Sequence, residues 1–152
     1  GMIIDACCKV GYAPRGVSWH FEMTPVDTLV KAISCFATTP SHYGRVYNIV
    51  QQETMPARTV FDLLSERNLI SGYTPIADWK SKLDIRADET GDRVLSLLAQ
   101  SLGEVESQLD NPVSYDCSKF QEALSSSGIP CPPVNAEYLL KGIVPGKFVL
   151  SL

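Results

Sequence analysis

The chain has 152 residues, enough for one ordinary domain around a single core, and we expect residues 1–152 to form one domain. Its net charge of −4 and its scattered lysines and arginines argue against a nucleic acid or an anionic membrane as a partner. No apolar run approaches the ~20 residues of a membrane span, and the first residues do not resemble a secretory signal. We therefore expect a cytoplasmic protein that does not contact a membrane.

The N-terminal 17 residues predict one helix and a loop. Gly1 directly before Met2 is typical of a residue left by tag removal, which would make the chain a portion of a longer protein. Residues 2–10 are apolar and compatible with a helix, and Gly11 is a plausible C-cap. Residues 12–17 contain a proline and a glycine and are typical of a loop that leads into the first strand.

Residues 19–50 are the most informative stretch, because they predict a strand, a capped helix, a turn and a second strand. Thr24 is expected to cap the helix, with Pro25 at its first position and Asp27 as the capping-box partner. Residues 46–50 are rich in β-formers and predict the second strand. One face of the helix is apolar: Val26, Leu29, Val30, Ile33, Phe36 and Ala37. This pattern predicts a βαβ-like unit at the edge of a larger parallel sheet.

The remaining sequence predicts mainly helices. A capping box at residues 59–62 predicts a short helix, and residues 73–75 precede a segment that carries Ile76, Trp79 and Leu83 on one face. Residues 88–102 predict a longer helix that ends at Gly103, followed by a helical turn at residues 105–109.

The last third predicts two further helices. A third capping box at residues 118–121 is expected to open a helix that ends at Gly128. Asn135 is expected to cap a final helix that carries Tyr138, Leu139, Leu140 and Ile143. The whole chain is therefore expected to be a helix-rich α/β fold with two or three short strands.

The sequence contains no motif of a catalytic, cofactor or metal site. None of its glycines satisfies the spacing of a dinucleotide-binding loop, and no P-loop or zinc-ligand pattern is present. Residues 115–119 match the Tyr-x-x-x-Lys pair of short-chain dehydrogenases, but Tyr115 is expected to precede the helix that Ser118 caps, so the pair would not share a helix face. The five cysteines form no Cys-x-x-Cys pair and are expected to be reduced thiols.

Four aromatic or sulfur-containing side chains are candidates for an apolar ligand surface. Trp19, Phe21 and Met23 share one parity of the predicted first strand, so they face the same way, although a core face would have the same pattern. Trp79 is the fourth candidate, and a tryptophan in its position is most often a packing anchor. His20 and Asp27 have structural explanations, as a lone strand histidine and a helix cap.

Several segments together resemble the C-terminal half of thioester reductase domains, which belong to the extended short-chain dehydrogenase/reductase group. The series begins with residues 11–14, 23–27 (Met-Thr-Pro-Val-Asp) and 44–50 (Gly-Arg-Val-Tyr-Asn-Ile-Val), and its most specific part is Thr-Pro-Val-Asp followed by an apolar helix and Val-Tyr-Asn-Ile-Val. Weaker matches follow in the same order: Trp79 with Leu83, residues 115–118 and residues 128–133. Such domains end non-ribosomal peptide synthetases, polyketide synthases, aminoadipate reductases and carboxylic acid reductases.

The resemblance implies a substrate-side lobe of an NADPH-dependent reductase that releases an acyl chain from a carrier protein as an aldehyde or an alcohol. The glycine-rich loop and the catalytic residues of the family precede the segment matched here, so none is carried over to this chain, which is expected to be inactive alone. The strand at residues 46–50 would join the edge of a Rossmann-like sheet. An exposed edge of this kind favours self-association.

Two alternatives stay open at the level of the sequence. The chain could be a stand-alone helical module that docks a carrier or another partner protein without chemistry. It could also be the equivalent part of another extended dehydrogenase, such as a fatty acyl reductase or a sugar epimerase.

Overall fold

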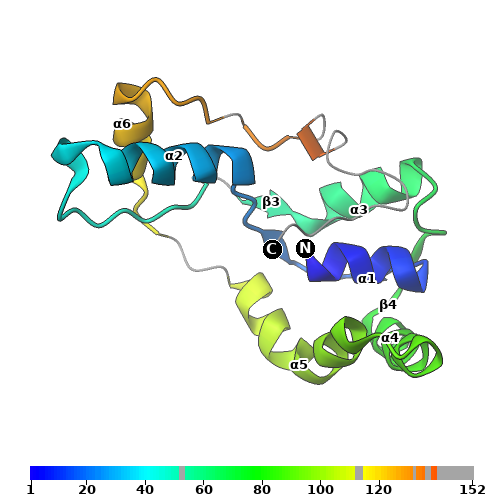
Figure 1. Cartoon of the computed structure of the whole chain (residues 1–152). Coiled ribbons are helices and arrows are strands. Elements are labelled where there is room, and N and C mark those ends of the chain that lie inside the picture. Colours follow the sequence, from blue (N-terminus) through cyan, green and yellow to red (C-terminus); the bar gives the residue numbers. More distant parts are fainter. Residues whose placement is uncertain (52–53, 112–114, 132, 136–137, 140–152) are drawn as a thin grey trace.

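The computed structural model describes residues 1–51, 54–111, 115–131, 133–135 and 138–139, and this part of the chain is helix-rich. Figure 1 shows α2 (Val26–Thr38) and α6 (Ser118–Ser126) together at one end of the molecule, and α1, α3, α4 and α5 at the other end. The helices are α1 (Met2–Val10), α2 (Val26–Thr38), α3 (Ala57–Glu66), α4 (Ile76–Thr90), α5 (Arg93–Asp110) and α6 (Ser118–Ser126), with the 3-10 helix η1 (Pro40–His42). The strands are β1 (Ala13–Arg15), β2 (His20–Phe21), β3 (Met55–Pro56) and β4 (Tyr73–Pro75). The predicted helix-rich α/β class is confirmed, but the described residues form four short strands and not the two or three that were predicted.

The strands pair over long sequence separations in two small sheets. β1 pairs in parallel with β4, with Ala13 opposite Tyr73 and Arg15 opposite Pro75. β2 pairs antiparallel with β3. The prediction of a loop at residues 12–17 is therefore wrong. The pairing depends on a segment some 60 residues away, which local sequence patterns do not report, and proline is tolerated because each strand has a free edge.

The predicted strand at residues 46–50 is wrong, because this segment forms no strand in the part of the chain that the structure describes. Two of its side chains, Tyr47 and Ile49, pack instead against the cluster around Phe120 that joins α2 to α6. Asn48 donates through its side-chain amide to the Asp116 carbonyl at 2.9 Å. The βαβ-like unit and the exposed sheet edge that the sequence predicted are accordingly not formed here.

Three helices begin directly after a proline rather than after a side-chain cap. Pro25, Pro56 and Pro75 precede α2, α3 and α4, and none of these helices has a side-chain cap. The predicted cap at Thr24 is wrong, since its hydroxyl donates to the Glu22 carboxylate. The capping box at residues 59–62 is also wrong, because these residues lie inside α3. Proline holds an extended approach to the helix and needs no donor partner itself, so the prolines define these starts.

The last helices begin close to where the sequence predicted, but the capping box at residues 118–121 is wrong, because Ser118 lies inside α6 and this helix has no side-chain cap. Cys117 precedes α6, whose first amide, on Ser118, donates to the Asp116 carboxylate at 2.9 Å. The predicted cap at Asn135 is confirmed, since its side chain accepts from the Tyr138 amide at 2.9 Å. Leu140 and Ile143, which were expected to continue this helix, lie outside the described residues.

The boundary between α4 and α5 differs from the prediction of a helix at residues 88–102. α4 ends at Gly91, which has a φ of 65°, and α5 then runs through Gly103 without a break. Asp92 caps α5, because its carboxylate accepts from the amides of Val94 at 2.9 Å and Leu95 at 3.3 Å. A left-handed residue is a stronger helix stop than an interior glycine, which costs only about 1 kcal/mol relative to alanine.

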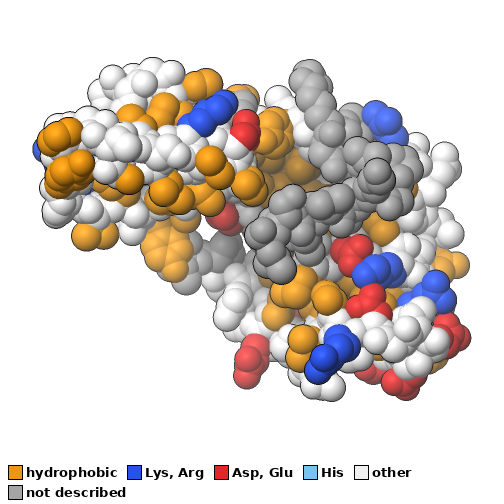
Figure 2. Space-filling view, viewed as in Figure 1, with side chains coloured by type: hydrophobic (Ala, Val, Ile, Leu, Met, Phe, Trp, Pro, Cys, Tyr) orange, Lys and Arg blue, Asp and Glu red, His pale blue; other side chains and the backbone are white. Residues whose placement is uncertain are grey.

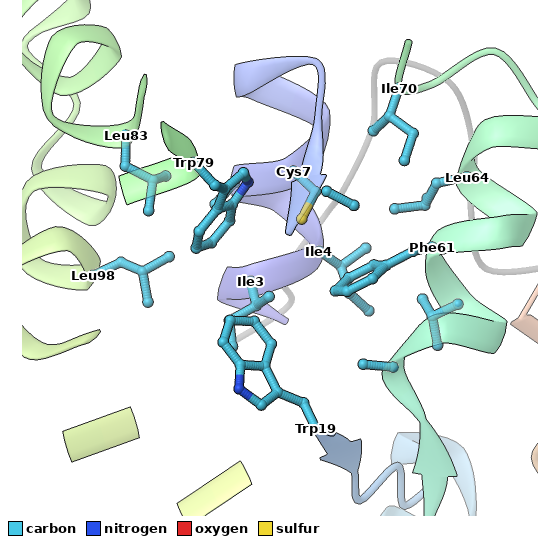
Figure 3. Close-up of a cluster of buried hydrophobic side chains, with 14 of the residues drawn as sticks. Ile3, Ile4, Cys7, Trp19, Phe61, Leu64, Ile70, Trp79, Leu83 and Leu98 are labelled. Atoms are coloured by element: carbon cyan, nitrogen blue, oxygen red, sulfur yellow. The ribbon is translucent and has the colours of Figure 1, made fainter. Parts of the chain in front are cut away.

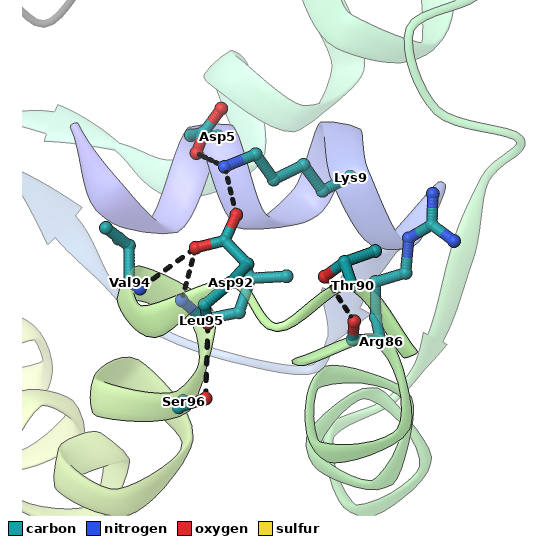
Figure 4. Close-up of polar contacts among 8 residues, drawn as sticks. All are labelled: Asp5, Lys9, Arg86, Thr90, Asp92, Val94, Leu95 and Ser96. Carbon is teal, nitrogen blue, oxygen red and sulfur yellow. Dashed lines mark hydrogen bonds and ion pairs between the residues drawn. The ribbon is translucent and has the colours of Figure 1, made fainter. Parts of the chain in front are cut away.

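Asp92 also ties α5 to α1. The Lys9 ammonium lies 2.7 Å from carboxylate oxygens of both Asp92 and Asp5, as Figure 4 shows. The hydrogen bond from Lys9 lowers the pKa of Asp92 below its ordinary value, and the amides of α5 act in the same direction while burial opposes them.

We expect Asp92→Ala to reduce the free energy of unfolding by about 1 kcal/mol through loss of the cap, or roughly 2–4 °C in Tm. The folded-state pKa of Asp92 is lowered, so its ionised carboxylate adds to the free energy of unfolding at pH values above the ordinary aspartate pKa near 4. This stabilisation is lost as the pH falls below that range. Thermal unfolding at pH 7 and pH 3 measures both effects. Asp84→Ala, at an exposed position on α4, is the matched control, and an equal loss in the two variants would contradict the capping role.

The main hydrophobic core surrounds α1. In Figure 3, Trp79, Leu83 and Leu98 lie on one side of α1, and Phe61 and Leu64 of α3 lie on the other. This arrangement confirms the predicted packing face of α4. A second, smaller cluster joins α2 to α6 through Ala32, Phe120 and Leu124.

Candidate substrate-binding site

A small apolar pocket of about 180 Å³ lies between α1, the residues around β2, and α5. Most of the side chains that line this pocket are hydrophobic, and Glu22 contributes a charged side chain. The lining residues are Gly1, Met2, Ile3, Ile4, Phe21, Glu22, Met23, Leu98, Val105 and Leu109. A pocket of this chemistry can hold a short hydrocarbon group with a polar end near the carboxylate.

The structure brings two of the four predicted site residues to this pocket. Phe21 and Met23 line it, as expected if the residues of one strand parity face one way. Trp19 and Trp79 belong to the core instead, with 2% and 0% of their surfaces exposed. Their rings meet edge to face at 6.1 Å, and the Trp79 indole nitrogen donates to the Tyr12 carbonyl at 2.8 Å. Ligand binding by the four residues stays a prediction, and the two tryptophans offer a ligand almost no free surface.

The sequence did not single out the α5 side of the pocket. Leu98, Val105 and Leu109 come from one continuous helix, whereas the sequence predicted a break at Gly103. The spacing of Leu98, Leu102, Val105 and Leu109 carries the signal, since it continues one helical face past the glycine. Ile3 and Ile4 of α1 reach the same pocket only through tertiary packing.

A larger, open pocket of about 810 Å³ lies between α6 and the segment that follows η1. Arg45 and Lys119 line it together with His42 and Glu122. The His42 ring is held by a 2.7 Å contact of Nδ1 with the Tyr47 hydroxyl and by stacking on Phe36 at 4.5 Å. Neither cation makes an ion pair with a carboxylate of the described residues. This pocket can therefore attract an anionic group.

The residues of the Tyr-x-x-x-Lys pattern are separated by the start of α6. Tyr115 is exposed before the helix, and Lys119 lies in its first turn. His20 contacts the Ser18 carbonyl through Nδ1 at 2.9 Å, and Asp27 accepts a 3.4 Å hydrogen bond from the Tyr138 hydroxyl.

No group of three or more metal-ligating side chains occurs among the described residues, and all five cysteines are free. Within the described ranges, no helix is both long and apolar enough to span a membrane.

The described residues do not fit the phosphates of a dinucleotide cofactor. Such a site needs a glycine-rich turn between a strand and a helix, where bare backbone approaches the pyrophosphate. Here β3 and β4 each lead into a helix through proline, and α2 also begins after proline. Gly16 follows β1, but the next element is β2 and not a helix. No step of hydride transfer is therefore assigned to these residues.

Comparison with known proteins finds similarity at the level of structure. No family model and no curated protein matches the chain. Its structure is similar to the crystal structure of the terminal R domain from the myxalamid PKS-NRPS biosynthetic pathway, with a TM-score of 0.71 and 26% sequence identity. The match covers 95% of this chain and 38% of that chain.

The fold thus matches part of a terminal R domain of a PKS-NRPS, and this likeness supports the resemblance to thioester reductase domains. The chain spans less than two-fifths of the length of that domain. The assignment to its C-terminal half stays a prediction.

Proposed function

We propose that the chain is the C-terminal, substrate-side portion of an NADPH-dependent thioester reductase domain. The observation that carries this proposal is the structural match to the terminal R domain over 95% of the chain, at 26% identity. The order of the sequence segments that resemble thioester reductases supports it independently of the structure.

In the intact domain, NADPH would supply the hydride that reduces a thioester on the arm of a carrier protein to an aldehyde and the free thiol of the arm, and a second reduction would give an alcohol. The described residues of this chain do not fit the phosphates of that cofactor, so no hydride step is assigned to them. The part of this chain in that reaction is to bind the acyl group and exclude water. Its apolar pocket between α1 and α5 is suited to that part.

We expect the isolated chain to transfer no hydride, because its described residues offer no phosphate site. The test follows NADPH absorbance at 340 nm with an acyl thioester of N-acetylcysteamine, a small mimic of the carrier arm. The 152-residue chain is compared with the longer chain of an intact reductase domain, which the proposal implies. Oxidation of NADPH by the 152-residue chain would contradict its inactivity, and failure of the longer chain to form aldehyde or alcohol would contradict the reductase function.

The acyl pocket is tested in the longer chain. Met23→Trp should fill the pocket and lower kcat/KM for the acyl thioester by roughly tenfold, since a pocket changed by a few methylene groups alters binding by about 1–3 kcal/mol. Ile85→Trp, at an exposed position on α4, is the control and should leave the rate unchanged. Equal rates in the two variants would place acyl binding elsewhere.

A further inference from the structure

A further pocket, of about 320 Å³, lies between the end of β1, α3 and β4. Two arginines and several apolar or aromatic side chains line it together, among them Pro14, Arg15, Val17, Arg58, Phe61 and Tyr73. We refer to it as the arginine pocket. Sites for small molecules are typically concavities of at least this size, with an apolar lining and a few polar groups that fix the orientation of the ligand. The arginine pocket has these features and is distinct from the acyl pocket between α1 and α5.

The apolar part of the arginine pocket is a wall of packed aromatic rings. Phe61 is buried, and its ring meets Tyr73 edge to face at a centroid distance of 6.5 Å. On its other side Phe61 meets Phe21 at 6.0 Å, and Phe21 lines the acyl pocket. The pairing of β1 with β4 fixes the backbone beside this wall, with Arg15 opposite Pro75. The pocket is therefore held open by packed elements and offers a flat apolar group an aromatic surface.

Arg15 brings an unpaired positive charge to this pocket. Figure 2 shows basic and acidic side chains next to one another over α4 and α5, where Lys80 lies 2.7 Å from the Glu106 carboxylate. Arg15, in contrast, is exposed at the end of β1 and forms no ion pair with a carboxylate within the described part of the chain. Its guanidinium is available to an anion from solution.

Asp62 of α3 orients the other two polar groups of the pocket. The Tyr73 hydroxyl donates to one of its carboxylate oxygens at 2.5 Å, and Nε of Arg58 lies 3.7 Å from the other oxygen. Because this ion pair uses Nε, the two terminal nitrogens of Arg58 remain for a ligand. A guanidinium presents its donors in a planar fork that matches the two oxygens of a carboxylate. Asp62 compensates part of the charge of Arg58, so the uncompensated positive charge of the pocket comes from Arg15.

We infer that the arginine pocket binds a small carboxylate that carries a flat apolar ring. The carboxylate lies beside Arg15 and Arg58, and the ring lies against Phe61. The rest of the lining is mainly apolar, which suits a ring better than the additional acceptor oxygens of a phosphate. The acyl pocket does not suit the same ligand, because Glu22 would repel its charge. The inference goes beyond the proposed function and does not depend on it, since it concerns side chains of this chain alone.

The test titrates benzoate into the 152-residue chain and follows the backbone amides by NMR. Benzoate should bind with a Kd of roughly 1 mM, a strength that so small a ligand can reach, and should shift the amides of Gly16, Phe61 and Tyr73. Benzamide has the same shape without the charge, and inorganic phosphate has charge without the ring. Each should bind about tenfold more weakly than benzoate, because each lacks one of the two contacts.

Arg15→Gln and Arg58→Gln should each weaken benzoate binding about tenfold, since each removes charge-assisted hydrogen bonds. Arg67→Gln, at an exposed position at the end of the same helix α3, is the matched control and should bind benzoate like the unmodified chain. Equal binding of benzoate and benzamide, equal binding of benzoate and phosphate, or shifts confined to the acyl pocket would overturn the inference. So would equal benzoate affinity in the Arg15 and Arg67 variants. The ligand comparisons use the unmodified chain, so they decide the question even if an arginine variant fails to fold.

Discussion

Replacing Trp79 with alanine is expected to cost about 3–5 kcal/mol, a large part of the stability of a domain of this size. Trp79 is fully buried and packs edge to face on Trp19 at a centroid distance of 6.1 Å. Its indole nitrogen donates a 2.8 Å hydrogen bond to the Tyr12 carbonyl, which links α4 to the turn before β1. The substitution thus creates a cavity beside α1 and leaves a carbonyl without its donor.

Phenylalanine at the same position separates the cavity from the lost hydrogen bond. Trp79→Phe should retain most of the apolar contacts but leave the Tyr12 carbonyl unpaired, at a cost of about 1–3 kcal/mol beyond the loss of ring area. Trp19→Phe is the matched control, because it removes a similar ring area from the same aromatic pair. Urea unfolding followed by circular dichroism measures both variants. Equal losses in the two would show that the hydrogen bond from Trp79 contributes nothing to stability.

The second large effect is a loss of stability at alkaline pH that depends on Cys7. Burial of Cys7 on α1 raises the pKa of its thiol far above the ordinary range, and the neighbouring Cys8 acts in the same direction. A group with a raised folded-state pKa stabilises the fold below its unfolded-state pKa, and this contribution is lost as the pH rises above that value. The unfolded thiol ionises near pH 8.5, so the free energy of unfolding should fall by about 1 kcal/mol between pH 8.5 and 9.5.

Urea unfolding under reducing conditions at pH 7.5, 8.5 and 9.5 measures this dependence. Cys7→Ala should flatten it, leaving the smaller contribution of Cys8, whose pKa is also raised by partial burial. Tyr73 has a raised pKa too, from burial and from its hydrogen bond to Asp62, but the ordinary range of tyrosine lies near pH 10, above this window. Cys35→Ala, at a half-buried position on α2, is the control and should keep the wild-type slope. An unchanged slope in Cys7→Ala would rule out Cys7 as its source.

The candidate site was predictable from the sequence only in part. Phe21 and Met23 could be selected together because alternation along an extended segment places them on one side. The opposite wall of the pocket comes from Ile3 on α1 and from Leu98 and Leu109 on α5. These residues are far apart in the sequence, and only the packing of α1 against α5 brings them together.

By itself, the sequence determined the features that depend on neighbours within a few residues. Residues 2–10 form a helix that ends at Gly11, Trp79 and Leu83 share a buried face of α4, and Asn135 accepts a hydrogen bond from the Tyr138 amide. Each follows from helical spacing or from the chemistry of one cap. Only the tertiary structure decided that β1 pairs with β4, that residues 46–50 form no strand, and which face of α2 is buried. These depend on contacts between distant segments, and the apolar pattern of α2 identifies a face that needs a partner without saying where that partner lies.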